Sequence, residues 1–192
     1  MVDDDVILEQ TEFVYDSVGN VVSTIARRRY HNAPDSQTGP LEDPSTTPKA
    51  RVTYVANYPD PLGRIIATAD YGTNGGTALS RPATVPARSD SVLVTTTSYN
   101  SAGRVASTAN AAGITSCLEY DAAGRQTKVV LNCVSESSSS SSSSSGCAGS
   151  DDVNVTVQTA YNGDGNVSSL TANNGVTGNQ TTQFVYGTTL AI

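Results

Sequence analysis

The feature that most constrains the fold of this chain is a short motif that occurs five times. The two most complete copies are adjacent: Y-N-S-A-G-R begins at Tyr99, and Y-D-A-A-G-R begins at Tyr120. Three more divergent copies are Y-D-S-V-G-N at Tyr15, Y-P-D-P-L-G-R at Tyr58 and Y-N-G-D-G-N at Tyr161. Because a motif that recurs along a chain is typical of repeat architectures, the repeat has to be interpreted before anything else.

Each copy predicts the turn of a β-hairpin. An Asp or Asn at the first turn position can accept hydrogen bonds from the backbone ahead of it, and a Gly at the fourth position adopts a positive φ angle without steric cost. A type I turn followed by a left-handed Gly is a common way to close a short hairpin loop. We therefore expect Asp121 and Gly124 to form one bend, with Tyr120 ending the incoming strand and Arg125 beginning the outgoing one. The same role is expected of Gly19, Gly63, Gly103 and Gly165.

The motif Y-D-x-x-G-R, repeated with a period near twenty, resembles the YD repeat of RHS-repeat proteins. These are large bacterial surface and polymorphic-toxin proteins, and the animal teneurins are similar to them. The resemblance rests on Tyr120-Asp121-Gly124-Arg125, Tyr99-Asn100-Gly103-Arg104 and Tyr15-Asp16-Gly19. Two copies depart from it: the Tyr58 unit has one residue inserted before Asp60, and the Tyr161 unit has Asn162 and Asn166 in place of Asp and Arg. The resemblance implies a strip of antiparallel hairpins from a spiralling β-shell, and it does not imply catalysis.

The composition agrees with an all-β repeat. The chain has no Trp and two Phe, and 37% of its residues are hydrophobic, whereas its nine Tyr, with Val and Thr, favour strands. Repeat units that pack mainly on their neighbours need few bulky core residues. We predict an all-β fold of consecutive antiparallel β-hairpins in a twisted repeat sheet, as a segment of an RHS-type β-shell. Since a last unit starts at Phe184-Val185-Tyr186-Gly187 without a return strand, we expect a fragment, or a module that needs neighbours.

The chain divides into five segments by composition. We predict a YD-repeat hairpin at 1–31, a Pro-rich surface loop at 32–50, further hairpins at 51–134, a disordered Ser-rich loop at 135–152, and a hairpin with the start of another unit at 153–192. The expected strands are 6–15, 21–26, 51–58, 64–69, 91–99, 104–109, 114–120, 125–132 and 153–161. Alternation places Val52, Tyr54, Ala56 and Tyr58 on one face of a strand, and Val153, Val155 and Val157 on one face of another.

The spacing of the motif tyrosines suggests hidden units. Successive tyrosines are 43, 41, 21 and 41 residues apart, so the long intervals are about twice the short one. We expect each long interval to contain an additional unit whose turn has been replaced by an insertion or a Gly-rich loop.

The net charge and the hydropathy of the chain limit the kinds of partner and the membrane contacts that can be expected. The formal net charge of −7 argues against nucleic acid, which favours a basic surface. The basic run Arg27-Arg28-Arg29 is expected to be a solvated strand end, with a polyanion or acidic-sugar contact as the alternative. No apolar run is long enough to span a bilayer, and the acidic start Met1-Val2-Asp3-Asp4-Asp5 does not resemble a signal peptide. We expect an extracellular or cell-surface location as part of a larger protein.

Residues that could carry chemistry are few. His31 is the single histidine, and without nucleophile-elbow spacing near it we expect an exposed polar side chain and not a member of a catalytic triad. Asp60-Pro61-Leu62-Gly63 resembles the autocleavage motif of RHS core regions, but Arg64 replaces its Leu, so we interpret the segment as a turn and keep self-cleavage as the alternative. Loss of fragmentation in Asp60→Asn would support self-cleavage.

Metal, phosphate and disulfide sites are also weakly indicated. Asn162, Asp164 and Asn166 imitate the start of a calcium loop, but the Gly and the bidentate Glu of such a loop are missing. Gly163 and Gly165 lack the following helix of a phosphate loop. Cys133 and Cys147 flank the serine run and could pair in an oxidising compartment, with Cys117 left over; the alternative is three unpaired thiols. Asn154, Asn166 and Asn179 begin glycosylation sequons.

These observations give two main functional hypotheses. The favoured one is a non-catalytic structural β-repeat segment of an RHS/YD-repeat cell-surface or toxin-shell protein, without catalytic residues, cofactors or metals. Its partners would be neighbouring repeats or the rest of a larger chain, and its open sheet edges would promote self-association. The alternative is a carbohydrate- or cell-surface-binding module that uses Tyr and Asn side chains. A hydrolase is the weakest hypothesis, because no general-base pair can be named.

Overall fold

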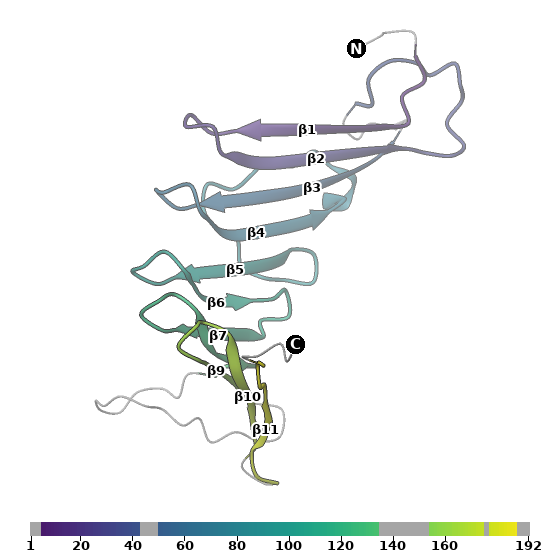
Figure 1. Ribbon diagram of the computed structural model, residues 1–192. Coiled ribbons are helices and arrows are strands. Elements are labelled where there is room, and N and C mark those ends of the chain that lie inside the picture. Colours follow the sequence, from purple (N-terminus) through teal and green to yellow (C-terminus); the bar gives the residue numbers. More distant parts are fainter. Residues whose placement is uncertain (1–4, 43–49, 135–153, 175–176, 188–192) are drawn as a thin grey trace. The chain divides into compact units, whose positions relative to one another are not determined.

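The computed structural model describes residues 5–42, 50–134, 154–174 and 177–187. These residues form eleven strands and one short 3-10 helix, η1, at Asn74–Gly76 (Figure 1). The strands are β1 Glu9–Tyr15, β2 Val21–Arg29, β3 Ala50–Pro59, β4 Ile65–Gly72, β5 Leu93–Tyr99, β6 Val105–Ala109, β7 Thr115–Tyr120, β8 Gln126–Leu131, β9 Val155–Tyr161, β10 Val167–Asn173 and β11 Gln180–Gln183.

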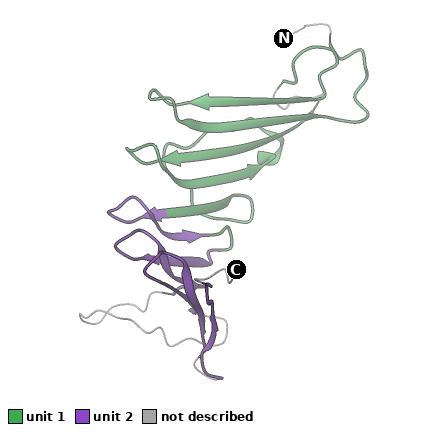
Figure 2. Ribbon diagram, in the orientation of Figure 1, with its two compact units in different colours: residues 1–97, 110–112 green, residues 98–109, 113–192 purple. Residues whose placement is uncertain are grey.

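The sheet is a continuous meander, in which hydrogen-bonded neighbours follow the order of the sequence. The registered pairs are antiparallel, as in β1–β2, β3–β4 and β7–β8. The predicted all-β fold of consecutive antiparallel hairpins is therefore confirmed. The chain clusters into two compact units, residues 1–97 with 110–112 and residues 98–109 with 113–192 (Figure 2).

The first unit contains a hydrophobic core on one face of its strands. The alternation predicted for β3 is confirmed, since Val52, Tyr54, Ala56 and Tyr58 are all buried. The next strands continue this face, because Ala56 pairs with Ala69, which pairs with Val94. The buried cluster is Val52, Tyr54, Ala56, Tyr58, Ala67, Ala69, Tyr71 and Val94. Small residues stand opposite two of the tyrosines on β4, since Tyr58 pairs with Ala67 and Tyr54 with Gly72.

Two long connections cover this face. In the connection between β4 and β5, Leu79 and Val92 pack against the core, and the Arg81 guanidinium lies 4.4 Å from the centre of the Tyr58 ring. The same connection contains a tight turn at Gly75-Gly76, where both glycines have positive φ. In the connection after β2, Leu41 is 1% exposed. The Pro-rich segment is thus not purely a surface loop, because this leucine anchors it to the sheet.

The interpretation of Arg27-Arg28-Arg29 as a solvated strand end is correct only for Arg28. Successive residues of a strand point to opposite faces, so Arg27 and Arg29 lie on the face that the loop covers. Arg27 is 5% exposed and pairs with Glu12 at 3.1 Å. Arg29 donates to the carbonyl oxygens of Gln37 at 2.8 Å and Pro34 at 2.6 Å, which ties the loop to the strand.

The second unit has few buried side chains. Val130 is its one buried hydrophobic residue among those described, and the cross-strand row Leu118–Val129–Val157 is half-buried. The alternation predicted for 153–161 does not separate a buried from an exposed face: β9 begins at Val155, which is 39% exposed. Val153 lies outside the described residues.

The expectation of an additional unit in a long tyrosine interval is wrong for the interval that the structure describes throughout, and stays a prediction for the other two. The interval from Tyr58 to Tyr99, which is described throughout, contains β4 and β5. The short interval from Tyr99 to Tyr120 likewise contains two strands, β6 and β7. The extra residues of the long interval lie in the connection 73–92, which joins β4 to β5. In the short interval, the connection 110–114 joins β6 to β7 with far fewer residues. Length was therefore added to a connection and not to the number of strands. The Ser-rich segment 135–152 lies outside the described residues.

Candidate functional site

The five motif turns share one backbone geometry. In each, the Asp or Asn amide donates to the carbonyl oxygen four residues later at 2.8–3.0 Å, and the Gly amide donates back to the Asp or Asn carbonyl at 2.9–3.2 Å. All five glycines have positive φ, with values of 93° at Gly19, 79° at Gly63, 78° at Gly103, 87° at Gly124 and 86° at Gly165. The central prediction from the sequence, that these glycines reverse the chain in a left-handed conformation, is confirmed.

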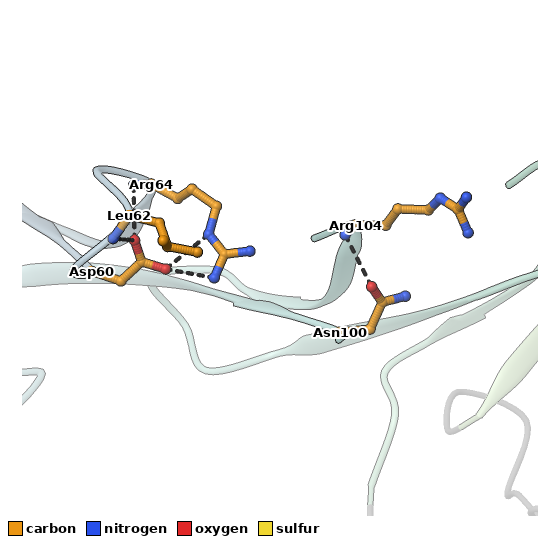
Figure 3. Close-up of polar contacts among 5 residues, drawn as sticks. All are labelled: Asp60, Leu62, Arg64, Asn100 and Arg104. Atoms are coloured by element: carbon orange, nitrogen blue, oxygen red, sulfur yellow. Dashed lines mark hydrogen bonds and ion pairs between the residues drawn. The ribbon is translucent and has the colours of Figure 1, made fainter. Parts of the chain in front are cut away.

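Two turns carry an internal ion pair. Oδ1 of Asp60 accepts the backbone amides of Leu62 at 2.9 Å and Arg64 at 3.0 Å, while Oδ2 accepts Nε and Nη2 of Arg64 at 2.8 and 2.6 Å (Figure 3). Asp121 binds Arg125 in the same forked way, at 2.8 and 2.7 Å. The Arg64 hydrogen bond is the main cause that lowers the pKa of Asp60, and the Arg125 backbone amide has the same role at Asp121.

Asparagine at the same position keeps the turn but not the ion pair. Oδ1 of Asn100 accepts the amides of Ala102 and Arg104, both at 3.0 Å, as Asp60 does in its own turn. The Arg104 guanidinium extends away from Asn100 (Figure 3). The turn therefore depends on one side-chain oxygen, and the second oxygen of a carboxylate adds a contact with the side chain that follows the glycine. In the Asp16 turn, Asn20 takes the place of arginine and donates Nδ2 to Oδ2 at 2.8 Å.

The residue after the turn glycine reaches the next repeat. Within the second unit, the Arg104 guanidinium lies 5.6 Å from the centre of the Tyr120 ring, and that of Arg125 lies 4.5 Å from the centre of the Tyr161 ring. A guanidinium over an aromatic face at this range is attracted by the ring quadrupole. Arg104 also packs against Gly124, where an added Cβ would come within 2.7 Å of its Cζ. This glycine is thus required by its φ angle and by its neighbour.

The motif tyrosine also binds the preceding repeat, through a hydrogen bond from its hydroxyl group to a backbone carbonyl oxygen. The Tyr161 hydroxyl donates to the carbonyl oxygen of Gln126, the second residue after the preceding turn glycine, at 2.8 Å. The Tyr186 hydroxyl donates at 2.9 Å to Val167, which has the same position after Gly165. Tyr186 therefore has the contact of a motif tyrosine, and the start of a further unit there stays a prediction.

The structure corrects the alignment of the Tyr58 copy. No residue is inserted in its turn, because Pro59 pairs with Ile65 as Tyr120 pairs with Gln126 and Tyr161 with Val167. Pro59 thus occupies the tyrosine position, and Tyr58, one residue earlier, points into the core. Counting back from Asp60 instead of aligning the tyrosines would have revealed this.

The side chains considered for other chemistry have structural surroundings. His31 is exposed, as predicted. Asn162 Oδ1 accepts the amides of Asp164 at 3.0 Å and Asn166 at 2.9 Å, so turn chemistry explains this group, as expected. In the described part of the chain, no group of three His, Cys, Asp or Glu side chains is placed to hold a metal ion.

Predictions about glycosylation, disulfide pairing, self-cleavage and membrane spans remain to be compared with the structure. Asn154 is buried and accepts the amide of Val134, so its sequon is closed in the folded chain. Cys147 lies outside the described residues, and its pairing with Cys133 stays a prediction. Self-cleavage at Asp60 also stays a prediction. No helix in the described residues is long and apolar enough to cross a membrane.

A polar hollow of about 380 Å³ lies on the second unit. Its lining residues are Glu119, Thr127, Lys128, Gln158, Thr159, Ala160, Ser169 and Thr171. Glu119, Lys128, Gln158 and Thr171 are successive cross-strand partners on β7 to β10. Lys128 donates to Glu119 at 3.0 Å, which neutralises the charge of the row. Sequence analysis missed this site, because the pattern appears only when the strands are placed side by side.

Comparison with known proteins identifies one segment of the chain. Residues 99–131 match the model of the RHS Repeat family. In this stretch all three strand connections, at 100–104, 110–114 and 121–125, are short. No curated protein sequence matches the chain.

Two solved structures are similar to the chain at low identity. One is a variant of the Photorhabdus luminescens Tc holotoxin pore, with 13% identity and a TM-score of 0.37, covering 86% of this chain and 8% of that one. The other is TcdB2-TccC3 without its hypervariable C-terminal region, with 12% identity and a TM-score of 0.33, covering 88% of this chain and 10% of that one. This chain thus spans a tenth or less of the length of either.

Proposed function

Since residues 99–131 are an RHS repeat, we propose that the chain is a non-catalytic structural segment of an RHS-type β-shell. The observation that carries the proposal is the contact between successive turns. The arginine after one turn glycine lies against the tyrosine or glycine of the next turn, as Arg104 does with Tyr120 and Gly124. The recurring side chains of the motif are therefore directed at neighbouring repeats. Such a segment would act at the cell surface or outside the cell, as part of a larger protein.

The test of this proposal is whether the motif residues serve stability alone. Arg125→Ala and Tyr161→Phe should lower the free energy of unfolding in urea, since they remove the stacked pair and the hydroxyl donor. Neither should change binding to a glycan array or hydrolysis of a general panel of ester, peptide and glycoside substrates. Loss of a binding or catalytic signal in these variants would contradict a purely structural role. Arg28→Ala, at an exposed arginine of the first unit, is the matched control.

The sheet edges suggest how the segment meets its neighbours. Among the described strands, β1 pairs with β2 alone and β11 with β10 alone, so each has one edge without a registered partner. Exposed strand edges promote pairing with other strands. The chain should self-associate in a dilution series followed by light scattering. Gln180→Lys with Gln183→Lys on β11 should reduce this association, whereas Thr53→Lys on β3, which has two neighbours, should not. A monomer at all concentrations would contradict the prediction.

A second candidate function is carbohydrate recognition at the polar hollow. Its row of carboxylate, ammonium, amide and hydroxyl groups offers donors and acceptors without a net charge, which suits a neutral polyhydroxyl ligand. The Tyr and Asn side chains that were expected to bind carbohydrate do not line the hollow, and the lack of an aromatic ring for stacking on a sugar argues against high affinity. A glycan array with the intact chain tests the idea, with Gln158→Ala as the disabling variant and Thr53→Ala as control. No binding, or binding unaffected by Gln158→Ala, would exclude this site.

A further inference from the structure

The five motif turns differ in how prone their first residue is to chemical change. Three begin with Asp, at Asp16, Asp60 and Asp121, and two begin with Asn, at Asn100 and Asn162. Asn162 is followed by Gly163, whereas Asn100 is followed by Ser101. The side-chain amide of an Asn can be attacked by the backbone nitrogen of the next residue, and a glycine there obstructs the approach least. Asn162 is therefore the turn residue to consider as a site of modification.

The geometry around Asn162 favours that attack. Its Oδ1 accepts two backbone N–H groups, from Asp164 at 3.0 Å and from Asn166 at 2.9 Å. This oxygen becomes negatively charged when a nucleophile adds to Cγ, and paired N–H donors stabilise such an oxyanion. The side-chain nitrogen, which must leave, donates no hydrogen bond within the described residues.

The nucleophile is also available. The Gly163 amide makes no hydrogen bond within the described residues, and Gly163 is exposed to the solvent base that must remove its proton. No atom lies within 4 Å of the position where a Cβ would stand. Solvent can therefore reach the backbone at Gly163 without displacing a neighbouring side chain.

We propose that Asn162 is a site of spontaneous deamidation in the folded chain. The Gly163 nitrogen loses its proton to solvent and forms a bond to Cγ of Asn162, and the tetrahedral intermediate expels Nδ2 as ammonia. The product is a five-membered succinimide. Water then adds to one of its two carbonyls and opens the ring, giving aspartate or isoaspartate at position 162. One water is consumed and one ammonia is released, and no oxidant or cofactor takes part.

The aspartate product has a structural precedent within the chain. In the Asp16 turn, the carboxylate accepts both the Asn20 amide and the Asn20 side chain, at 2.8 Å each. Residue 166 is also an asparagine, so deamidation would convert the Asn162 turn into the Asp16 type. The isoaspartate product would instead insert a carbon into the backbone and disturb the bond from the Asn162 amide to Asn166. The reaction thus either strengthens or breaks the same turn.

The chain contains two internal controls. Asn100 has the same pair of N–H donors on Oδ1, both at 3.0 Å, but the larger Ser101 as nucleophile. Asn74 is followed by Gly75, but its Nδ2 donates to Thr77 and Ala78, which holds the leaving group, and no described N–H donates to its Oδ1. If the proposal is right, Asn162 reacts faster than either.

The experiment is incubation of the intact chain at mildly alkaline pH, followed by peptide mapping with tandem mass spectrometry. Asn162 should gain about one mass unit at least about tenfold faster than Asn100 and Asn74, because the oxyanion donors and the free nucleophile act together there. Gly163→Ser, which copies the Asn100 turn, should reduce the rate to that of Asn100. Deamidation of Asn162 no faster than of Asn100, or in the urea-unfolded chain alone, would overturn the proposal.

Discussion

The two units build the same repeat and stabilise it by different means. In the first, the long connection 73–92 packs on the sheet and encloses Tyr54, Tyr58 and Tyr71. In the second, the connection 121–125 is only a short turn, and stacked Arg–Tyr pairs join successive turns.

The difference shows what a repeat of this kind requires. Hydrogen-bonded strands and glycine turns are common to both units, so they define the architecture. A buried core is an addition that one unit has and the other largely lacks. The segment that matches the RHS Repeat, residues 99–131, is the one without a long connection. The motif is thus most recognisable in a stretch whose strand connections are all short.

The largest expected effect comes from breaking the core of the first unit. Tyr54 is 1% exposed, and Tyr54→Ala should lower the free energy of unfolding by about 3–5 kcal/mol, as truncation of a buried aromatic does. Tyr161→Ala in the second unit removes a half-buried ring and should cost about 1–2 kcal/mol. Equilibrium unfolding in urea measures both. Equal losses of unfolding free energy would show that the buried core of the first unit contributes no more stability than the half-buried packing of the second.

The next effect separates the two reasons why a turn position requires glycine, namely its positive φ angle and its contact with the neighbouring repeat. Gly19→Ala imposes a positive φ on alanine with open space around it, and should cost about 1–2 kcal/mol. Gly124→Ala adds a collision with Arg104, so its cost in urea unfolding should be larger by about 1–3 kcal/mol. In an Arg104→Ala background the difference should disappear. If it persists, the contact between repeats is not what makes Gly124 special.

A smaller effect should appear in alkali and depend on the first unit. Burial, with a contribution from Tyr58, raises the pKa of Tyr71 to about 12, above the ordinary value near 10. The folded state then holds the phenolic proton more tightly than the unfolded state, so stability present below about pH 10 is lost as the pH rises towards 12. Urea unfolding at increasing pH measures this, and Tyr71→Phe should flatten the curve. If the pH dependence of the unfolding free energy is the same in Tyr71→Phe, other groups cause the loss of stability in alkali.

The smallest effect concerns the ion pairs of the turns in acid. The pKa values of Asp60 and Asp121 are lowered, so the unfolded state binds protons first and stability falls as the pH drops below about 4. Asp60→Asn in the first unit and Asp121→Asn in the second convert these turns to the Asn100 type. Each should weaken the acid dependence and change neutral stability little, because exposed ion pairs contribute little. Hydrogen exchange of Leu62 and Ala123 would report the two turns separately. A collapsed turn in either variant would show that the arginine fork is essential.

Much of the fold could be predicted from local residue chemistry. The Asx–x–x–Gly spacing located every motif turn, and the alternation in β3 identified its buried face. What could not be predicted depends on residues distant in sequence. Arg27 is buried and pairs with Glu12 on another strand, and Leu41 is buried although it stands in a Pro-rich segment.

The sequence by itself determined where the chain reverses, because a positive φ at glycine and a side-chain oxygen three residues before it are local requirements that neighbouring residues satisfy. Only the tertiary structure decided what each extra stretch of chain does. A long tyrosine interval could hold more strands or a longer connection, and the choice depends on whether its apolar residues find a sheet face to cover. Leu79 and Val92 find one in the first unit, so residues 73–92 became a cover and not another hairpin.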